Sequence, residues 1–253
     1  MSERLTGKTA LIFGAGRVGG SAARAFVNEG AKVIILDRDE DKLETLKEEL
    51  EQTKRGFCST ICANIDNQKD VDEISNLIEE NTWKVDILLN CPAYIFRAPF
   101  LNHPIDEIDR QWHINVRIVF MVSQAVAKMM AKNGGGKIIN LASVGGLFPE
   151  REHAGHCAAK AGIIAISRVM ALELAPLNIQ VNVIAPGPTE TIPFSSPFYS
   201  QHPEVLKRIE ERTPAGRIGH PEDHTGLMVF LASEESNWIT GQVILSDGGL
   251  GLV

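Results

Sequence analysis

The sequence predicts an α/β protein: a single-domain, doubly wound parallel sheet of about seven strands with helices on both faces. Apolar runs of strand length alternate with helical patterns along most of the 253 residues, which is typical of strands buried on both faces and joined by crossover helices. A glycine-rich turn follows the first such strand. We find no repeat, linker or low-complexity segment, so residues 1–253 are expected to form one domain.

The first 37 residues predict a Rossmann-type βαβ unit. Residues 9–13 and 33–36 have the pattern of buried strands, and residues 21–29 that of a helix. The turn between them has the form G-x-G-x-x-G, which lets backbone N–H groups approach a pyrophosphate at a helix N-terminus. The expected contacts from this turn are Gly14, Gly16, Arg17, Val18 and Gly19.

The other elements follow in alternation. Further strands are expected at residues 57–63, 85–89, 137–141, 181–184 and 243–245. Three helices are expected from apolar stripes. Their members are Leu43, Leu46 and Leu50 in the first, Ile118, Val122, Ala125 and Met129 in the second, and Ala158, Ala161, Ala165, Val169 and Leu172 in the third, whose small residues permit close helix packing.

One long segment, at about 187–219, is interrupted by prolines and is expected to be irregular. A loop of this length in a compact domain is usually a lid or a binding segment. Its apolar members suggest a partly apolar substrate: Ile192, Phe194, Phe198 and Tyr199. The equal alternative is a loop that packs against the body of the protein or a partner subunit.

Composition limits the classes of partner. A formal net charge of −7 argues against nucleic acid or an anionic membrane surface. The polar N-terminus lacks the pattern of a signal peptide, and no apolar run approaches the roughly 18 residues of a membrane span. Cys58 and Cys62 are expected to be buried, reduced thiols. The composition therefore favours a soluble cytoplasmic protein.

Ligands of an open parallel sheet bind at the carboxyl ends of its strands. The residues that follow the predicted strands include Asp37, Asn64, Ile65, Asn90, Pro186 and Gly187. The Asp37 carboxylate can accept hydrogen bonds from ribose hydroxyls, and it would repel a 2′-phosphate by about 4 kcal/mol at ~4 Å and an effective dielectric of ~20. Arg17 and Arg38 could instead pair with that phosphate. NAD is the expected cofactor, with NADP the less favoured one.

The chain resembles the short-chain dehydrogenase/reductase family over nearly its full length. The resemblance is carried by the glycine turn, Asn90, Asn115, Lys160 and Thr191, and by the runs Ile138-Ile139-Asn140-Leu141-Ala142-Ser143, Val181-Asn182-Val183-Ile184-Ala185-Pro186-Gly187-Pro188 and Ile239-Thr240-Gly241-Gln242-Val243 with Asp247-Gly248-Gly249. It implies a nicotinamide cofactor, a small-molecule substrate, and a homodimer or homotetramer built from the two long helices. It also implies that Thr189 and Thr191 meet the nicotinamide amide.

The family's active site is a set of Asn, Ser, Tyr and Lys, which the resemblance places at Asn115, Ser143, position 156 and Lys160. The Tyr position is His156, thirteen residues after Ser143 and four before Lys160. In the family the Tyr is the general acid/base, the Lys binds the nicotinamide ribose and lowers the Tyr pKa, the Ser holds the substrate oxygen, and the Asn anchors a proton-relay water. Three other positions also depart from the family pattern: Val18 replaces a glycine, Asn64 an adenine-contacting Asp, and Asn90-Cys91-Pro92-Ala93 the usual Asn-Asn-Ala-Gly.

His156 and Lys160 are four residues apart, so on a helix they share a face. Imidazole is a competent general base, and a neighbouring ammonium favours its neutral form. The expected function is therefore NAD(H)-dependent hydride transfer between nicotinamide and an alcohol or carbonyl substrate, with His156 as acid/base. The alternatives are a reductase of a conjugated C=C or C=N bond and a nucleotide-binding protein without turnover. His153 and His156 lack a clear third ligand, so no metal site is expected.

Overall fold

The computed structural model describes residues 3–54, 57–191 and 203–253. Within these residues seven strands form one parallel sheet, in the order β3-β2-β1-β4-β5-β6-β7. This confirms the predicted doubly wound fold. The strands are β1 (Thr9–Phe13), β2 (Lys32–Asp37), β3 (Cys58–Cys62), β4 (Ile87–Asn90), β5 (Gly136–Leu141), β6 (Ile179–Pro186) and β7 (Val243–Ser246).

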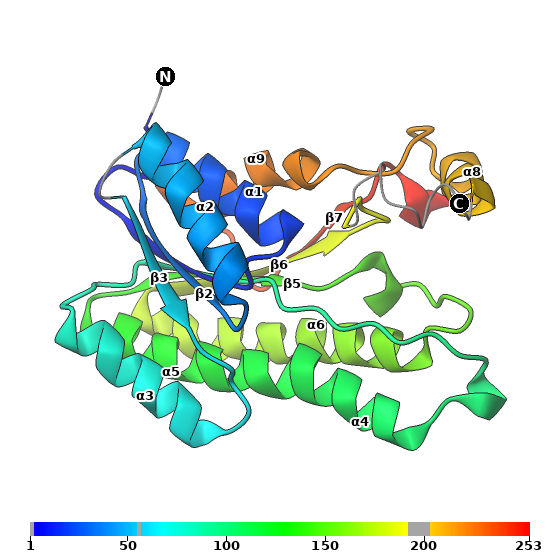
Figure 1. The fold of residues 1–253 in the computed structure, drawn as a ribbon, viewed down its shortest axis with the longest axis horizontal. Helices are drawn as coiled ribbons and strands as arrows, with labels where there is room; N and C mark the ends of the chain where they lie inside the picture. The colour runs from blue at the N-terminus through cyan, green and yellow to red at the C-terminus, as the bar shows by residue number, and fades with distance from the viewer. Residues whose placement is uncertain (1–2, 55–56, 192–202) are drawn as a thin grey trace.

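Helices cover both faces of the sheet (Figure 1). One layer holds α1 (Arg17–Asn28), α2 (Glu40–Thr53) and α9 (Thr225–Ala232). The opposite layer holds α3 (Gln68–Glu80), α4 (Ile105–Trp112), α5 (Ile118–Lys132) and α6 (Ala154–Leu174). Each layer packs its apolar side chains onto one face of the strands and forms its own core cluster. Alternate residues of a strand enter opposite clusters, as with Leu11 and Ile12 of β1.

The strand order reverses between β1 and β4, which are neighbours in the sheet although three helices and two strands separate them in sequence. The chain winds outward from β1 to β3 in one direction and from β4 to β7 in the other. A crevice forms at such a reversal, outside the carboxyl ends of the strands. The segments that follow β1, β4, β5 and β6 therefore converge on one edge of the sheet.

The structure buries one of the predicted apolar helix stripes and exposes another. Leu43, Leu46 and Leu50 are buried on α2, as expected. On α6, however, the small apolar stripe from Ala158 to Leu172 lies on the exposed side, with Leu172 79 % exposed. The inner side carries Ala159, Ile163, Ser167 and Ala171, with His156 and Lys160 on the same side. Because α6 has small or apolar residues around most of its circumference, periodicity alone chose the wrong face.

Three helical elements run without a break from Ile105 to Lys132, through α4, a π-helical turn η2 (His113–Arg117) and α5. This helix is long and apolar enough to cross a membrane, which corrects the expectation that no such segment exists. It is mostly buried, packed against α3, α6 and the sheet, as a core helix of a globular domain is. Its apolarity is therefore explained by the core.

Two further expectations need correction. The segment at 187–219 is not wholly irregular, because α8 (Pro203–Arg212) forms within it. Proline is tolerated at the first position of a helix, and an ion pair from Lys207 to Glu211 spans one turn at 3.7 Å. Ile192, Phe194, Phe198 and Tyr199 lie outside the described residues.

The second expectation that needs correction is the burial of both cysteine thiols, Cys58 and Cys62. Cys62 ends the edge strand β3 and is exposed, whereas Cys58 is buried. Both are free cysteines.

Candidate active site

The glycine turn between β1 and α1 leaves the N-terminus of the helix open. Gly16 precedes the first turn of α1, and no side chain caps the helix there. A Cβ atom on Gly16 would meet nothing within 4 Å, whereas one on Gly19 would collide with the Gly14 carbonyl oxygen. The turn is thus tight on its inner side and empty on its outer side. Exposed backbone N–H groups at a helix N-terminus are suited to hold a diphosphate.

Asp37 stands beside this turn at the end of β2. Its Oδ2 accepts a hydrogen bond from the Ala15 N–H at 2.6 Å, and its Oδ1 accepts one from the Asp39 N–H at 3.1 Å. These bonds fix the carboxylate next to the mouth of the turn. Asn64 and Ile65 follow the adjacent strand β3, the first exposed and the second buried. The structure therefore brings the predicted adenosine-side residues to one edge of the sheet.

Arg17 points across the cleft to a residue that the sequence analysis missed. Its Nη2 lies 3.2 Å from Oε2 of Glu190, and Nδ1 of His220 lies 3.2 Å from the same oxygen. Glu190 is only 6 % exposed. The ion pair joins the glycine turn to the segment after β6. The only sequence signal for it is an acid placed between Thr189 and Thr191.

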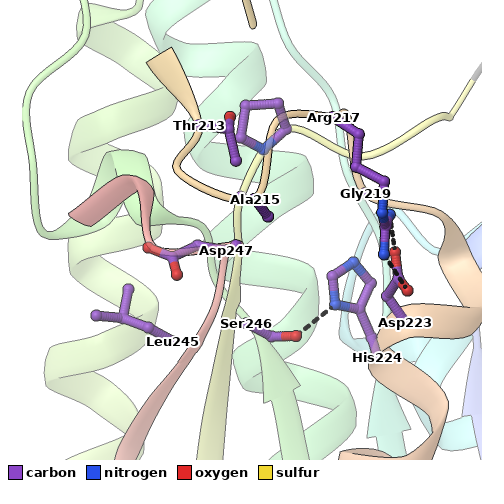
Figure 2. A pocket seen from close by; sticks show the side chains of 12 residues that line it. Thr213, Ala215, Arg217, Gly219, Asp223, His224, Leu245, Ser246 and Asp247 are labelled. Atoms are coloured by element: carbon purple, nitrogen blue, oxygen red, sulfur yellow. Dashed lines mark hydrogen bonds and ion pairs between the residues drawn. The ribbon is translucent and has the colours of Figure 1, made fainter. Parts of the chain in front are cut away.

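The segment 187–189, which follows β6, is held by partly buried hydrogen bonds. The Thr189 hydroxyl donates to the Gly187 carbonyl oxygen at 2.9 Å and lies 2.9 Å from Nε2 of His224. The other ring nitrogen of His224 lies 2.8 Å from the Ser246 hydroxyl (Figure 2). This histidine therefore ties Thr189 to the end of β7.

A cavity of about 320 Å³ lies beside this segment. Figure 2 shows Arg217 paired with Asp223 on one wall and Asp247 on another. Ser143, His156 and Lys160 do not line it. The cavity is therefore separate from the residues that are candidates for chemistry.

Asn90, at the end of β4, is turned into the sheet. Its Nδ2 donates to Oδ1 of Asn140 at 2.7 Å and to the Ser123 hydroxyl at 3.0 Å, while Oδ1 has no partner among the described residues. The next residue, Cys91, packs its backbone against Gly14, where an added Cβ would lie 3.2 Å from the Cys91 carbonyl carbon. Asn90 thus supports the strand ends, and Cys91 stands closest to the glycine turn.

The loop after β5 meets the start of α6 at two glycines that the sequence analysis did not single out. A Cβ on Gly146 would lie 2.8 Å from the Lys160 carbonyl carbon, so only glycine lets α6 pack this closely. A Cβ on Gly145 would lie 3.6 Å from Ser143 Oγ and 3.5 Å from His156 Cδ2. Ser143 and His156 therefore flank the same backbone position. The Ser-x-Gly-Gly pattern of residues 143–146 was the available signal.

Asn115 is fully buried in the π-helical turn η2. Its Oδ1 accepts from the Tyr94 N–H at 2.9 Å, and its Nδ2 donates to the Tyr94 carbonyl oxygen at 2.8 Å. The side chain thus clamps the segment that follows β4. Such single-turn π-helices are frequent at functional sites.

His156 and Lys160 are buried one turn apart. The Lys160 ammonium donates to the Leu141 carbonyl oxygen at 2.9 Å, and burial lowers its pKa to about 8. Burial, and then the positive charges of Lys160, His153 and Arg97, lower the pKa of His156 to about 3. The imidazole is therefore neutral near pH 7. Its Nδ1 is buried without a partner in the described part of the chain.

His153 lies close to this imidazole, with the two ring centroids 6.1 Å apart. Its Nδ1 lies 2.7 Å from the Arg151 carbonyl oxygen and 3.8 Å from a Glu150 carboxylate oxygen. Over residues 3–54, 57–191 and 203–253, no three His, Cys, Asp or Glu side chains are grouped as metal ligands.

Comparison with known proteins places this geometry among oxidoreductases. Residues 15–251 match the family model described as enoyl-(acyl carrier protein) reductase. The chain is 34 % identical to a 3-oxoacyl-(acyl-carrier-protein) reductase of Thermotoga maritima, over 98 % of this chain and 99 % of the relative. It is 30 % identical to an NAD-dependent glycerol dehydrogenase of Listeria innocua, over 97 % and 94 %.

Among solved structures, the chain is similar to a gluconate 5-dehydrogenase of Burkholderia cenocepacia, in complex with NADP and tartrate. The TM-score is 0.91 and the identity 32 %, with 99 % of this chain and 98 % of that one covered.

Proposed function

The chain belongs to the short-chain dehydrogenase/reductase family and is an oxidoreductase, and from that premise we propose that it transfers hydride between NAD(H) and an alcohol or carbonyl group, with His156 as the acid/base. The observation that carries the proposal is the buried, neutral imidazole of His156. Its ring and the Ser143 hydroxyl both lie close to Gly145, and its Nδ1 has no partner among the described residues.

The cofactor side of the proposal rests on the open glycine turn and Asp37. The open N-terminus of α1 would hold the pyrophosphate, and Asp37 the adenosine ribose. When bound, the nicotinamide supplies or accepts the hydride. NAD is favoured over NADP because the fixed Asp37 carboxylate would repel a 2′-phosphate, and because Arg17 is already paired with Glu190. A solved relative is in complex with NADP, and comparison of the dissociation constants of NADH and NADPH tests the preference.

The remaining cofactor contacts follow from the strand ends. Asn64 and Ile65 would line the adenine side, and Asn90 would support the crevice from within the sheet. Pro186, Gly187, Thr189 and Thr191 would meet the nicotinamide end, and Lys160 its ribose. The hydrogen bonds of Thr189 to Gly187 and His224 supply a rigid base for this end.

The chemistry proposed for the chain's own residues is a proton transfer at His156. The Ser143 oxygen accepts a hydrogen bond from the Gly145 N–H at 3.1 Å, which leaves its hydroxyl proton free to bind the substrate oxygen. In oxidation, a ring nitrogen of His156 takes the alcohol proton as hydride leaves the carbon; in reduction, the proton returns to the oxygen. Burial, and then the charge of Lys160, lower the pKa of the imidazole and keep it neutral. Asn115 holds the backbone of Tyr94 in the segment after β4.

A second candidate is reduction of a conjugated C=C or C=N bond. It is favoured by the description of the matching family model, an enoyl reductase. It is also favoured by the low pKa of His156, because an imidazole that resists protonation is a poor acid toward an alkoxide. In this reaction hydride goes to carbon, and residue 156 need not supply the proton.

The test measures NADH absorbance with a panel of alcohols, ketones and enones, together with NADH binding by fluorescence. Replacement His156→Ala is expected to reduce kcat on the alcohol and ketone panel at least about 100-fold, with NADH affinity unchanged. Arg168→Gln, at an exposed position farther along α6, is the control and should retain most of the rate. Undiminished turnover in His156→Ala would exclude the acid/base role. Turnover of enones alone, at a rate that His156→Ala does not change, would favour the second candidate. NADH binding without turnover of any substrate would favour a nucleotide-binding protein without catalytic activity.

We also propose that the protein is a cytoplasmic homodimer or homotetramer. The apolar side chains left exposed on α5 and α6 support this: Phe120 is 44 %, Val169 54 % and Leu172 79 % exposed. A second pair of such helices would cover them. The segment at about 187–219 is proposed to border a small-molecule substrate, with no role for nucleic acid or membrane.

A further inference from the structure

We propose that the substrate carries an oxyanion group, a carboxylate or a phosphate, and that the Arg97 guanidinium binds it at the entrance to the site, beside the N-terminus of α6. The inference rests on the proposed hydride-transfer function, whose substrate class it narrows.

Hydrogen bonds on both sides fix the backbone of Arg97. The Phe96 N–H donates to Oε1 of Gln111 on α4 at 3.3 Å, and the Ala98 N–H donates to the Glu152 carbonyl oxygen at 3.0 Å. The second bond joins the segment after β4 directly to the turn that leads into α6. Arg97 is thereby held next to the residues that precede His153 and His156.

Arg97 has no ion pair or hydrogen bond with any residue that the structure describes, and its side chain is exposed. Two carboxylates, one on α4 and one in the turn before α6, have other partners. Glu107 accepts from the Tyr94 hydroxyl at 2.8 Å, and Glu150 lies 3.8 Å from the His153 ring. By contrast, Arg110, one turn before the π-helical segment, stacks on the Tyr94 ring with its guanidinium carbon 4.3 Å from the centroid. The Arg97 guanidinium is therefore available to a ligand.

The start of α6 also favours an anion. This helix begins at Ala154 after His153, no side chain caps it, and its first turn contains no acid. A helix N-terminus carries a partial positive charge and unpaired N–H groups, which bind anionic oxygens. Within this first turn lies His156, which is 6 % exposed and has a buried Nδ1 without a partner in the described chain. An incoming polar group would give this Nδ1 the hydrogen-bond partner that the described residues do not supply.

The charges around His156 all have one sign, although the whole chain carries a net charge of −7. Besides burial, which is the largest cause, Lys160, His153 and Arg97 each lower the pKa of this imidazole, and no acid among the described residues raises it. An anion bound among these groups would offset their repulsion and favour protonation of His156. The substrate's own charge would thus bring the proposed acid/base closer to the range in which it can exchange a proton at neutral pH.

The test is a binding measurement that does not depend on turnover. Isothermal titration of the NADH-saturated protein uses malonate and inorganic phosphate as probes and malonamide as the uncharged counterpart of malonate. Saturation with NADH fills the glycine turn, so that anions report on the second site. The same titrations without NADH show whether anion binding survives if the cofactor assignment fails.

We expect malonate or phosphate to bind at least tenfold more tightly than malonamide, and the stronger of the two anions identifies the substrate's group. Arg97→Gln should remove this preference, and Arg97→Lys should retain part of it because the charge is kept but the bidentate geometry is lost. Arg168→Gln, at an exposed position farther along α6, is the matched control and should bind as the wild type does.

Equal binding of malonate and malonamide, full anion affinity in Arg97→Gln, or no anion binding up to about 50 mM would each overturn the inference. Failure of NADH to bind, with Arg97-dependent anion binding intact, would overturn the proposed function alone.

Discussion

Replacing His156 by glutamine should make the protein less sensitive to acid. In the folded protein the imidazole pKa is lowered from 6.5 to about 3, first by burial and then by Lys160, His153 and Arg97. Between these two values the unfolded chain binds a proton that the folded chain does not. Stability must therefore fall as the pH falls through the unfolded pKa.

The size of the effect follows from the same two values. At about pH 5 the unfolded imidazole is almost fully protonated and the folded one almost fully neutral. The linkage relation then gives a loss of about 2 kcal/mol in the free energy of unfolding between about pH 7.5 and pH 5 from this residue alone. Because His156 is only 6 % exposed, solvent screening leaves this value little reduced.

Urea unfolding at the two pH values, for the wild type and His156→Gln, measures this contribution. Glutamine is neutral at both, so the variant should lose about 2 kcal/mol less on acidification than the wild type. His224 is also buried with a lowered pKa, but it contributes equally to both proteins. An identical pH dependence in the two proteins, or a His156 ring whose NMR shifts titrate near pH 6.5, would refute a neutral, buried imidazole.

Three further predictions concern the cofactor cleft and the packing beneath it. Asp37→Ala should narrow the preference for NADH over NADPH at least about tenfold, a change of ~1.4 kcal/mol, in fluorescence titrations; an unchanged ratio of dissociation constants would contradict the role of this carboxylate. Gly16→Ala adds a Cβ to empty space at a φ of −63°, so the urea midpoint should hardly change while NADH affinity falls; equal NADH affinity would place the pyrophosphate elsewhere. Gly146→Ala forces a Cβ to within 2.8 Å of the α6 backbone and should cost about 1–3 kcal/mol in unfolding free energy; a cost near zero would show that the packing of α6 is looser than described.

The fold and the cofactor edge could be predicted because both depend on local sequence patterns. Apolar strand runs, glycine spacing and an acid at a strand end each report their own surroundings. β1 matches its predicted range, and the ends of the other strands differ by only a few residues. The predicted cofactor residues follow strands that prove to end at one edge of the sheet.

The faces of α6 could not be predicted in this way. Its exposed stripe is as apolar as its buried side, and the buried side carries a serine, a histidine and a lysine. Hydrophobic periodicity assigns such polar residues to solvent, yet here they are directed toward the sheet and the loop after β5. Likewise, the charge run of α8 is a valid helical pattern that the surrounding prolines concealed.

Local sequence patterns also do not show which residues the charged side chains pair with. Arg17 and Glu190 are far apart in sequence and meet only because the segments after β1 and β6 converge. The charges around His156 come from α6, from the turn before it, and from the segment after β4. Burial first, and then these charges, lower the pKa of the imidazole and keep it neutral.

By itself, the sequence determined the parallel sheet, the dinucleotide-type turn and the presence of a histidine in line with Ser143 and Lys160, because backbone propensity and burial act over a few neighbouring residues. Only the tertiary structure decided that this histidine is neutral, that Arg17 is paired with Glu190 and that Arg97 has no ion-pair partner among the described residues. Electrostatic energies depend on distances through space and on the exclusion of water, and both are set when segments remote in sequence pack together.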